Sequence, residues 1–331
     1  MSPTTVLLTG AGGAALPALI DRLRGGGYRV VAVDADANAA GLYLADRGYR
    51  IPFANDPEFV AVLRRVCRAE EVRALVPLVD EELLASAQLA SELGIALIGP
   101  CPAFIGLSLD KYALMKRMAA AGLPTPNTRL LNAGLEGMQF PIILKPRVGR
   151  GSRGIKVLWN RGELDAYVES VQPDGQATLL QSYVQGVEYT VSVVAWRDGQ
   201  VRAVVPKEVI DKRGITRIAI TRRIDAIDLL CRAIQQRLRA DGPFNVQLRL
   251  DPTDGTPLTF EINPRFSTTI TLTQAAGVDE LGSLVDMALG RETPSSAWEW
   301  KEGVTLIRRT VDSFITANAY RERRREIESP P

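Results

Sequence analysis

The first hundred residues alternate two kinds of hydrophobic pattern. Short apolar runs, such as Thr5–Gly10, Tyr28–Asp36 and Ile95–Pro100, are typical of buried strands, and amphipathic helical patterns lie between them. A chain in which strands and helices alternate in this way folds as a parallel sheet covered by helices. We therefore predict an α/β unit for the first third of the chain.

The bulk properties limit the class of protein. The chain has 331 residues, which predicts two or three packed subdomains. Its net charge of +2 argues against a large surface for nucleic acid. Its three cysteines, Cys67, Cys101 and Cys231, form no CxxC pair, so neither a disulfide framework nor a zinc site is expected.

Targeting signals and histidine are both missing from the sequence. The start has no basic region followed by an apolar run, and no run approaches the ~20 apolar residues of a membrane helix. We therefore expect a cytoplasmic protein without a membrane partner. The count of histidines is 0, which removes histidine triads and histidine-ligated metals. Chemistry must then depend on carboxylates, amides, lysines, arginines and hard metal ions.

A glycine cluster, Gly10–Ala15, follows the first predicted strand and opens a helix. Gly10, Gly12 and Ala15 nearly satisfy the GxGxx(G/A) fingerprint, and Asp34 ends the second strand where a ribose-binding acid would lie. An NAD-dependent dehydrogenase is therefore one hypothesis. The alternative is that the glycines form only a tight turn between strand and helix, whose helix N-terminus could still receive an anionic substrate.

Two alternating runs, separated by the turn formers DPTDGTP, predict a hairpin within Asn245–Thr269. Strand side chains alternate between faces, so Leu258, Phe260 and Ile262 are predicted on an apolar face. The opposite face would then bring together three oxygen-bearing side chains, namely Gln247, Glu261 and Asn263. Mg²⁺ prefers such hard oxygen donors and often shares them with substrate phosphates. The hairpin therefore predicts a metal site, against the alternative of an ordinary polar sheet face.

A second glycine-rich segment follows the apolar run that ends at Lys145. The segment Val148–Gly154 offers backbone N–H groups that can hold phosphates, and it can close over them. No GK[ST] follows the glycines, so this is not a Walker A motif. In isolation the segment could equally be a hairpin loop with basic tips.

Four segments together resemble the ATP-grasp superfamily: DKYALMKRMAAAGLPTP, FPIILKPRVGRGSRGIKV, LLQSYVQGVEYTVSVV and NVQLRL…FEINPRFS. They occur in the family's order over about residues 108–290. The pairing NVQ…EINPR is especially similar to the large subunit of carbamoyl-phosphate synthetase, and the single-module pyrrolysine-biosynthesis ligase is also similar. The resemblance implies an α/β fold, with an α+β ATP-grasp part. The expected domains are a Rossmann-like pre-ATP-grasp domain at 1–108, an ATP-grasp domain at 109–290 with a lid at about 128–184, and a C-terminal tail at 291–331.

The resemblance also implies roles for nucleotide-binding residues. Lys111 and Lys145 match the basic residues that hold ATP phosphates. Ser182 and Val184 match the hinge whose backbone binds adenine, although the family usually has Glu at the first position. Glu188 matches the ribose-binding acid. The lid loop corresponds to Gly149, Gly151, Ser152 and Gly154.

The expected catalytic end of the site comes from the hairpin. Gln247, Glu261 and Asn263 match the metal ligands, with Glu261 bridging two Mg²⁺ ions. Gln247 stands where many relatives have an acid, so one carboxylate remains of the usual two. Arg265 matches the arginine that steadies the transferred phosphoryl group, and Lys145 is expected to share this catalytic role.

The resemblance implies an ATP- and Mg²⁺-dependent carboxylate–amine ligase that forms an amide through an acyl phosphate. Its expected partners are small-molecule carboxylates and amines, and a homodimer is left open. A carbamoyl-phosphate-synthetase-like module acting on bicarbonate or carbamate is the enzymatic alternative. A nucleotide-binding module without catalysis is the alternative of another class, besides the dehydrogenase.

Two interpretations remain for the residues that could contact substrate. The charged residues of the segment KEVIDKRGITR could line the acceptor side of the cleft or could lie on an exposed edge strand. They are Lys207, Glu208, Lys212, Arg213 and Arg217. Asp80 and Glu81 follow a predicted strand. They could face an amine or could cap the next helix.

Overall fold

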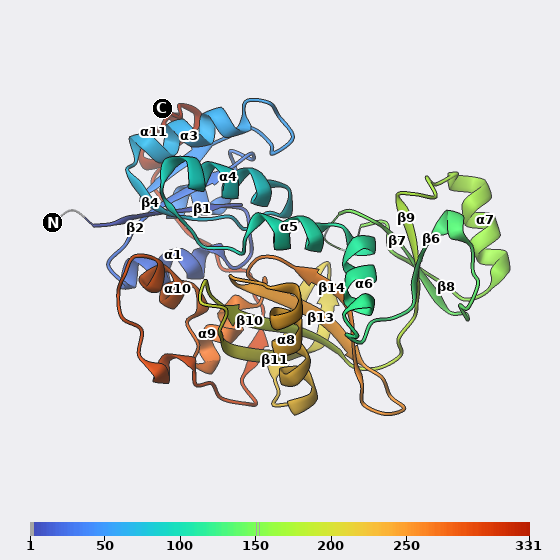
Figure 1. The fold of residues 1–331 in the computed structure, drawn as a ribbon. Coiled ribbons are helices and arrows are strands. Elements are labelled where there is room, and N and C mark those ends of the chain that lie inside the picture. The colour runs from blue at the N-terminus through green and yellow to red at the C-terminus, as the bar shows by residue number, and fades with distance from the viewer. Residues whose placement is uncertain (1–2, 150, 152) are drawn as a thin grey trace.

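The computed structural model describes residues 3–149, 151 and 153–331. The chain forms three sheets, and Figure 1 shows one of them, with helix α7, standing apart from the other two. The first sheet has the strand order β3-β2-β1-β4-β5, and its paired strands are parallel. Its strands are β1 (Thr5–Thr9), β2 (Arg29–Asp34), β3 (Arg47–Arg50), β4 (Val72–Val76) and β5 (Ala96–Leu97). This sheet confirms the predicted α/β unit.

Helices cover both faces of the first sheet. Leu8 of β1 packs with α1 and α2, whereas its neighbour Leu7 packs with Phe59 of α3 and residues of α4. Successive strand residues point to opposite faces, so both must be apolar when both faces are covered. The helices of this part are α1 (Leu16–Gly25), α2 (Ala40–Leu44), α3 (Phe59–Ala69), the short 3₁₀ helix η1 (Asp80–Glu82), α4 (Leu83–Leu93) and α5 (Pro102–Leu109).

The second sheet is small and antiparallel, with the order β6-β9-β7-β8. Its own core is formed around Ile142, Leu144 and Leu164. All four strands lie within the segment 128–184, which the sequence predicted as the lid. The elements are β6 (Thr128–Leu130), η2 (Leu131–Ala133), β7 (Ile142–Pro146), β8 (Lys156–Leu158), α7 (Arg161–Val171) and β9 (Thr178–Ser182).

The third sheet has the order β14-β13-β10-β11-β12-β15 and is antiparallel. Residues of α6 and α8 pack on one face, and those of α9 and α10 pack on the other and join the core of the first sheet. Its strands are β10 (Glu188–Ala195), β11 (Val201–Arg213), β12 (Ile215–Thr221), β13 (Phe244–Leu250), β14 (Pro257–Asn263) and β15 (Thr305–Ile307). Its helices are α6 (Lys111–Ala120), α8 (Asp225–Leu238), α9 (Ile270–Ala276) and α10 (Glu280–Ala288).

The C-terminal segment returns to the first sheet. After η3 (Ser295–Trp298) and β15, helix α11 (Ala317–Glu328) lies against β3. Ile327 is fully buried, and the ring of Tyr320 stacks on Tyr43 with centroids 5.6 Å apart. Most residues of this charged helix are exposed, but Ile327 joins the core of the first sheet and Tyr320 packs on α2, so the end of the chain is not frayed. No helix of the described residues has the length and hydropathy that a membrane crossing requires.

Candidate active site

The hairpin β13–β14 brings the predicted oxygen donors together. Gln247 pairs with Glu261 and Asn245 pairs with Asn263 across the two strands. Residues directly opposite each other in an antiparallel pair share a face. Thr190 of β10 continues this face, because it pairs with Gln247. These residues line a cleft of about 180 Å³, together with Glu188, Lys212, Arg265, Ser267 and others.

A β-bulge changes the predicted alternation in β14. The register passes from Gln247–Glu261 directly to Leu248–Thr259, so Phe260 is the extra residue. Leu258 then pairs with Arg249 on the polar face, and the Phe260 ring lies 5.8 Å from the Lys145 ammonium. The prediction that Leu258, Phe260 and Ile262 share one apolar face is therefore wrong for the first two, because one inserted residue reverses the alternation.

The proposed metal ligands have a donor set that fits a hard cation. The Asn263 amide nitrogen donates to the Asn245 side-chain oxygen over 3.3 Å, which leaves the Asn263 oxygen free to act as a ligand. Glu261 supplies a carboxylate and Gln247 a second amide oxygen. The described residues contain no group of three or more His, Cys, Asp or Glu that could hold a metal ion. A cation here would therefore need oxygens from a phosphate ligand as well, as Mg²⁺ commonly does.

Lys145 reaches the same face from the second sheet. It lies near the end of β7, is 3% exposed, and donates to the Gln181 side-chain oxygen over 2.9 Å and to the Phe260 carbonyl over 3.1 Å. Burial lowers the pKa of Lys145 to about 8, although the attraction of Glu261 opposes this shift. The residue can therefore bring a positive charge beside the metal ligands and the glycine-rich loop.

Lys111 and the glycine-rich loop form the wall opposite the hairpin. The Lys111 ammonium donates to the Gly149 carbonyl, and a small cavity is lined by Lys111, Lys145, Gly149, Gly151, Arg153 and Glu261, among others. Gly149, Gly151 and Gly154 have φ values of 130°, 70° and 71°, which favour glycine. Ser152, which the sequence assigned to this loop, lies outside the described residues.

Asp110 explains why Lys111 is placed at the start of α6. Its carboxylate caps the helix by accepting from the amides of Tyr112 and Ala113, each over 3.1 Å. The same carboxylate pairs with Arg147 over 2.6 Å, and the hydrogen bond from Arg147 lowers the pKa of Asp110. This pair joins the helix to the loop that follows β7. Neither Asp110 nor Arg147 was predicted as a site residue.

The residues predicted as the hinge are not part of the described lining of the cleft. Among the described residues, neither Ser182 nor Val184 belongs to the cleft wall, whereas Glu188 does. Arg249 connects these positions: its guanidinium donates to the Val184 carbonyl and to Glu188, each over 3.1 Å, and lies 5.3 Å from the Tyr183 ring centre. Sequence reasoning missed Arg249, although its place two residues after Gln247 on the polar face was a usable signal.

Glu188 is held by two cations. Burial alone would raise its pKa, but Lys212, 2.8 Å away, and Arg249 together lower the pKa below its usual value. The carboxylate is therefore ionised at neutral pH and can accept hydrogen bonds from hydroxyl groups.

Arg265 contacts the end of the first sheet. Its guanidinium pairs with Asp80 of η1, and both side chains are largely buried. Neither η1 nor α4 has a side-chain hydrogen bond at its N-cap, so Asp80 does not cap the following helix, as one alternative expected. The Arg265 amide donates to the Asn263 carbonyl over 2.8 Å, so the arginine and a proposed metal ligand belong to one turn.

The first glycine cluster forms a tight turn. The Gly12 amide donates to the Asp34 carboxylate over 2.8 Å, and the same carboxylate accepts from the Asp36 amide over 2.9 Å. Gly10 has a φ of 68°, and a Cβ there would lie 2.6 Å from the Val79 side chain. Asp34 is thus used by the loop itself, and Gly10 packs against the neighbouring strand end. This arrangement favours the tight-turn alternative over a dinucleotide site.

Lys207 lies neither on the acceptor side of the cleft nor on an exposed edge strand, the two positions that were predicted. It is fully buried in β11, which is an inner strand, and donates to Ser192 over 2.7 Å and Thr273 over 2.9 Å. Ser192 in turn donates to Glu280 over 2.8 Å. Burial lowers the pKa of Lys207 to about 8 and raises the pKa of Glu280, and the attraction between the two groups opposes both shifts. Lys207 can therefore neither contact substrate nor lie on an exposed edge, because a long side chain buries its charge here against hydroxyl groups.

The remaining charged residues of that segment differ from Lys207. Lys212 lines the cleft, and Glu208 pairs with Arg222 over 2.6 Å. Arg213 and Arg217 are exposed.

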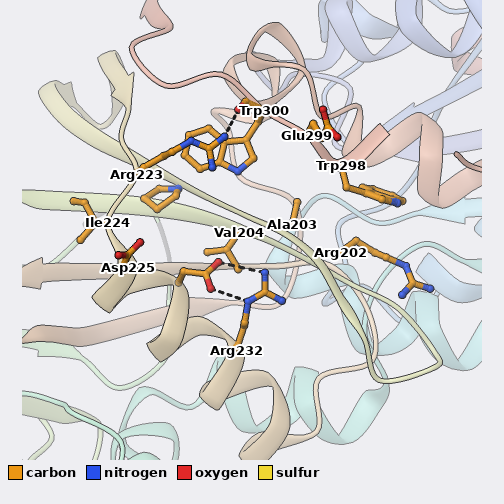
Figure 2. Close-up of a pocket in the computed structure, with 12 residues that line it drawn as sticks. Arg202, Ala203, Val204, Arg223, Ile224, Asp225, Arg232, Trp298, Glu299 and Trp300 are labelled. Carbon is orange, nitrogen blue, oxygen red and sulfur yellow. Dashed lines mark hydrogen bonds and ion pairs between the residues drawn. The ribbon is translucent and has the colours of Figure 1, made fainter. Parts of the chain in front are cut away.

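A separate cavity of about 470 Å³ lies elsewhere on the third sheet. Figure 2 shows it between β11, the start of α8 and the loop that carries Trp298 and Trp300. Its arginines already have partners: Arg223 lies 4.2 Å from the Trp300 ring centre, and Arg232 pairs with Asp228 over 2.7 Å. None of the predicted site residues that the structure describes lines it, so it is distinct from the cleft.

Comparison with known families agrees with this geometry. Residues 174–310 match the family model described as "ATP-grasp in the biosynthetic pathway with Ter operon", and residues 6–98 match the "PylC-like, N-terminal domain". The matched segment 174–310 is therefore an ATP-grasp domain. In this chain the ATP-grasp domain follows a PylC-like N-terminal domain, as the two matched segments show.

Individual relatives are distant. A carbamoyl-phosphate synthase of Methanobrevibacter smithii is 25% identical over 81% of this chain and 77% of its own. The carbamoyl phosphate synthase large chain of Thermotoga neapolitana is 26% identical over 77% of this chain, which spans only 25% of that relative.

Solved structures show the same fold. The L-amino acid ligase of Bacillus licheniformis superposes with a TM-score of 0.73 at 19% identity, covering 91% of this chain and 78% of that one. The biotin carboxylase–βγ-ATP complex of Campylobacter jejuni gives 0.72 at 20% identity, covering 90% and 73%. Likeness at this identity concerns the fold alone.

Proposed function

We propose that the chain is an ATP- and Mg²⁺-dependent carboxylate–amine ligase that forms an amide through an acyl phosphate. The observation that carries the proposal is that Lys111, Lys145 and Glu261 face one cavity under the glycine-rich loop. Two buried cations beside one carboxylate suit a metal-bound polyphosphate. The lysines neutralise the negative charge of the phosphates, and the carboxylate can hold the metal ion. We place ATP phosphates here, with adenine at the hinge Ser182–Val184 and ribose near Glu188.

The proposed chemistry has two steps. A substrate carboxylate oxygen attacks the γ-phosphorus of ATP, so ADP leaves and an acyl phosphate forms. An amine then attacks the acyl carbon, the nitrogen loses a proton, and phosphate leaves. Lys145 and Arg265 hold the transferred group, and the glycine-rich loop excludes water that would hydrolyse the acyl phosphate. Gln247, Glu261 and Asn263 would hold Mg²⁺, which would neutralise phosphate charge, and we propose that two ions bind.

The test measures ADP release from purified protein with ATP and Mg²⁺ over a grid of carboxylates and amines. We expect ADP that depends on both an organic carboxylate and an amine, and no ADP from Glu261→Gln, because the variant lacks the only carboxylate among the proposed ligands. Equal ADP release by Glu261→Gln would remove the metal assignment. The matched control is Glu208→Gln, which changes a carboxylate of the same sheet that pairs with Arg222 outside the cleft.

A carbamoyl-phosphate-synthase-like reaction is the second candidate, and the similarity to that class of relatives favours it. The same grid includes bicarbonate and ammonia as substrates. ADP release that depends on bicarbonate alone would select this candidate over the amide ligase.

We further propose a cytoplasmic protein, and light scattering of the purified chain tests for a homodimer.

A further inference from the structure

Asp80 lies in the N-terminal domain, yet it holds a side chain of the proposed ATP site. Its carboxylate pairs with Nε of Arg265, and the two side chains are 12% and 14% exposed. Arg265 lines the cleft together with Gln247, Glu261 and Asn263. The pair therefore connects the end of the first sheet to the catalytic end of the third.

Two of the three nitrogens of Arg265 have hydrogen-bond partners among the described residues. Nε is used by Asp80, and Nη1 donates to the Phe266 carbonyl over 3.1 Å. Among the described residues, Nη2 has no hydrogen-bond partner. A planar guanidinium held at two nitrogens has a fixed orientation, so the third is directed in advance.

The glycine turn supports the loop that carries Asp80. The Leu78 amide donates to the hydroxyl of Thr9, which is fully buried, over 3.1 Å. Gly10 lies so close to Val79 that a Cβ added at Gly10 would be 2.6 Å from the Val79 side chain. The glycine cluster thus fixes the two residues before Asp80, which gives this motif a use other than holding a nucleotide.

We infer that Asp80 is a positioning residue: from the N-terminal domain it orients the Arg265 guanidinium toward the terminal phosphate of the bound nucleotide. The inference rests on the proposed function, because it requires MgATP in the cleft. Asp80 acts through Arg265 and does not contact the nucleotide. The alternative is that Asp80 only masks the charge of Arg265, and the two ideas predict opposite changes.

The experiment compares nucleotide affinities by calorimetry, using MgADP and the magnesium complex of β,γ-methylene-ATP. The measured quantity is the dissociation constant of MgADP divided by that of the β,γ-methylene-ATP complex. A larger ratio means that the site recognises the terminal phosphate more strongly. We expect Asp80→Ala to reduce this ratio about tenfold and to leave MgADP binding unchanged, because only the hydrogen bond that orients Arg265 is lost. Asp80→Asn should retain most of the ratio, because its side-chain oxygen can still accept from Nε.

Two comparisons make the result specific. Arg22→Gln removes the Arg22–Asp279 ion pair, which also joins the N-terminal domain to the third sheet's helices but lies outside the cleft; it should leave the ratio unchanged. Adding Asp80→Ala to Arg265→Ala should reduce the ratio no further, because the two residues act as one unit. If Asp80→Ala fails to fold, Asp80→Ser replaces it, since a serine is too short to reach Nε.

The outcomes separate the inference from the proposed function. A wild-type ratio in Asp80→Ala, additive effects of the two alanines, or an increased ratio in both Asp80→Ala and Asp80→Asn would overturn the positioning role while leaving the ATP site in place. A wild-type protein that binds neither nucleotide would overturn the ATP site and this inference with it.

Discussion

The ammonium group of Lys145 lies 2.9 Å from the side-chain oxygen of Gln181, at a point where 3% of the lysine is exposed. The contact keeps the group near the proposed phosphates, although burial lowers its pKa to about 8. A neutral amine attracts phosphate far less than an ammonium does.

Binding of MgATP should therefore weaken as the pH rises from 7 to 9.5. The folded protein without ligand loses the Lys145 proton near pH 8, below the usual lysine pKa, so the binding-competent form declines above that pH. Calorimetric titration at several pH values measures the effect. The Lys145→Gln variant should bind more weakly and should lack this dependence; a wild-type affinity that stays constant to pH 9.5 would contradict the prediction.

Exchanging Gln247 for glutamate should strengthen metal binding. The variant restores a second carboxylate opposite Glu261, and Mg²⁺ prefers charged oxygen ligands. We expect the Mg²⁺ concentration needed for half-maximal MgATP binding to fall about tenfold, which corresponds to ~1.4 kcal/mol. Gln247→Ala is the matched loss of a ligand and should raise that concentration. An unchanged requirement in both variants would remove Gln247 from the ligand set.

Loss of Arg249 should weaken nucleotide binding. Arg249→Met keeps the apolar stem of the side chain but removes the links to Val184 and Glu188. We expect the Kd for MgATP to rise about tenfold, as the loss of charged hydrogen bonds allows. Lys212→Met removes only one partner of Glu188 and should have a smaller effect. Equal effects of the two variants would show that Arg249 does not order the hinge.

The buried pair of Lys207 and Glu280 should show strong coupling in stability. Lys207→Met removes the attraction that opposes the burial of the Glu280 carboxylate and removes the donor to Ser192 and Thr273, so we expect a loss of about 1–3 kcal/mol. Adding Glu280→Gln should restore most of this loss, because the remaining group is neutral and Ser192 can still donate to it. Urea denaturation of both single variants and the double variant measures the coupling. Simple additivity would contradict it.

Helix α11 should contribute to the stability of the first sheet. Ile327→Ala removes a fully buried side chain, and such truncations cost about 2–4 kcal/mol. Arg325→Ala, at an exposed position of the same helix, should change the free energy of unfolding by less than about 0.5 kcal/mol. Thermal or urea unfolding distinguishes the two. A change in Ile327→Ala as small as in the control would mean that the helix does not pack on the first sheet in solution.

Some features were predictable because they depend on local patterns. The parallel sheet followed from apolar runs such as Thr5–Gly10, and the partnership of Gln247 with Glu261 followed from turn residues between two alternating runs. The tight turn at Gly10 was one of two stated alternatives, and the hydrogen bonds of Asp34 and the close approach of Gly10 to Val79 favoured it. The face of Phe260 was mispredicted, because a bulge depends on how two strands fit together.

The sequence by itself determined which chemistry is available and which strands carry it. Without histidine, the chemistry of the chain must depend on carboxylates, amides, lysines, arginines and hard metal ions. Periodicity then assigned Gln247, Glu261 and Asn263 to one face. These features depend on residue type and on neighbours close in the chain.

Only the tertiary structure decided which distant residues complete the site. Asp80 meets Arg265 across 185 positions of sequence, and Lys207 is buried against Thr273 and Glu280 because α9 and α10 cover that face of the sheet. The same charged residue types look alike in a sequence whether they are solvated or buried. Their burial and partners depend on contacts between elements that packing, rather than local periodicity, brings together.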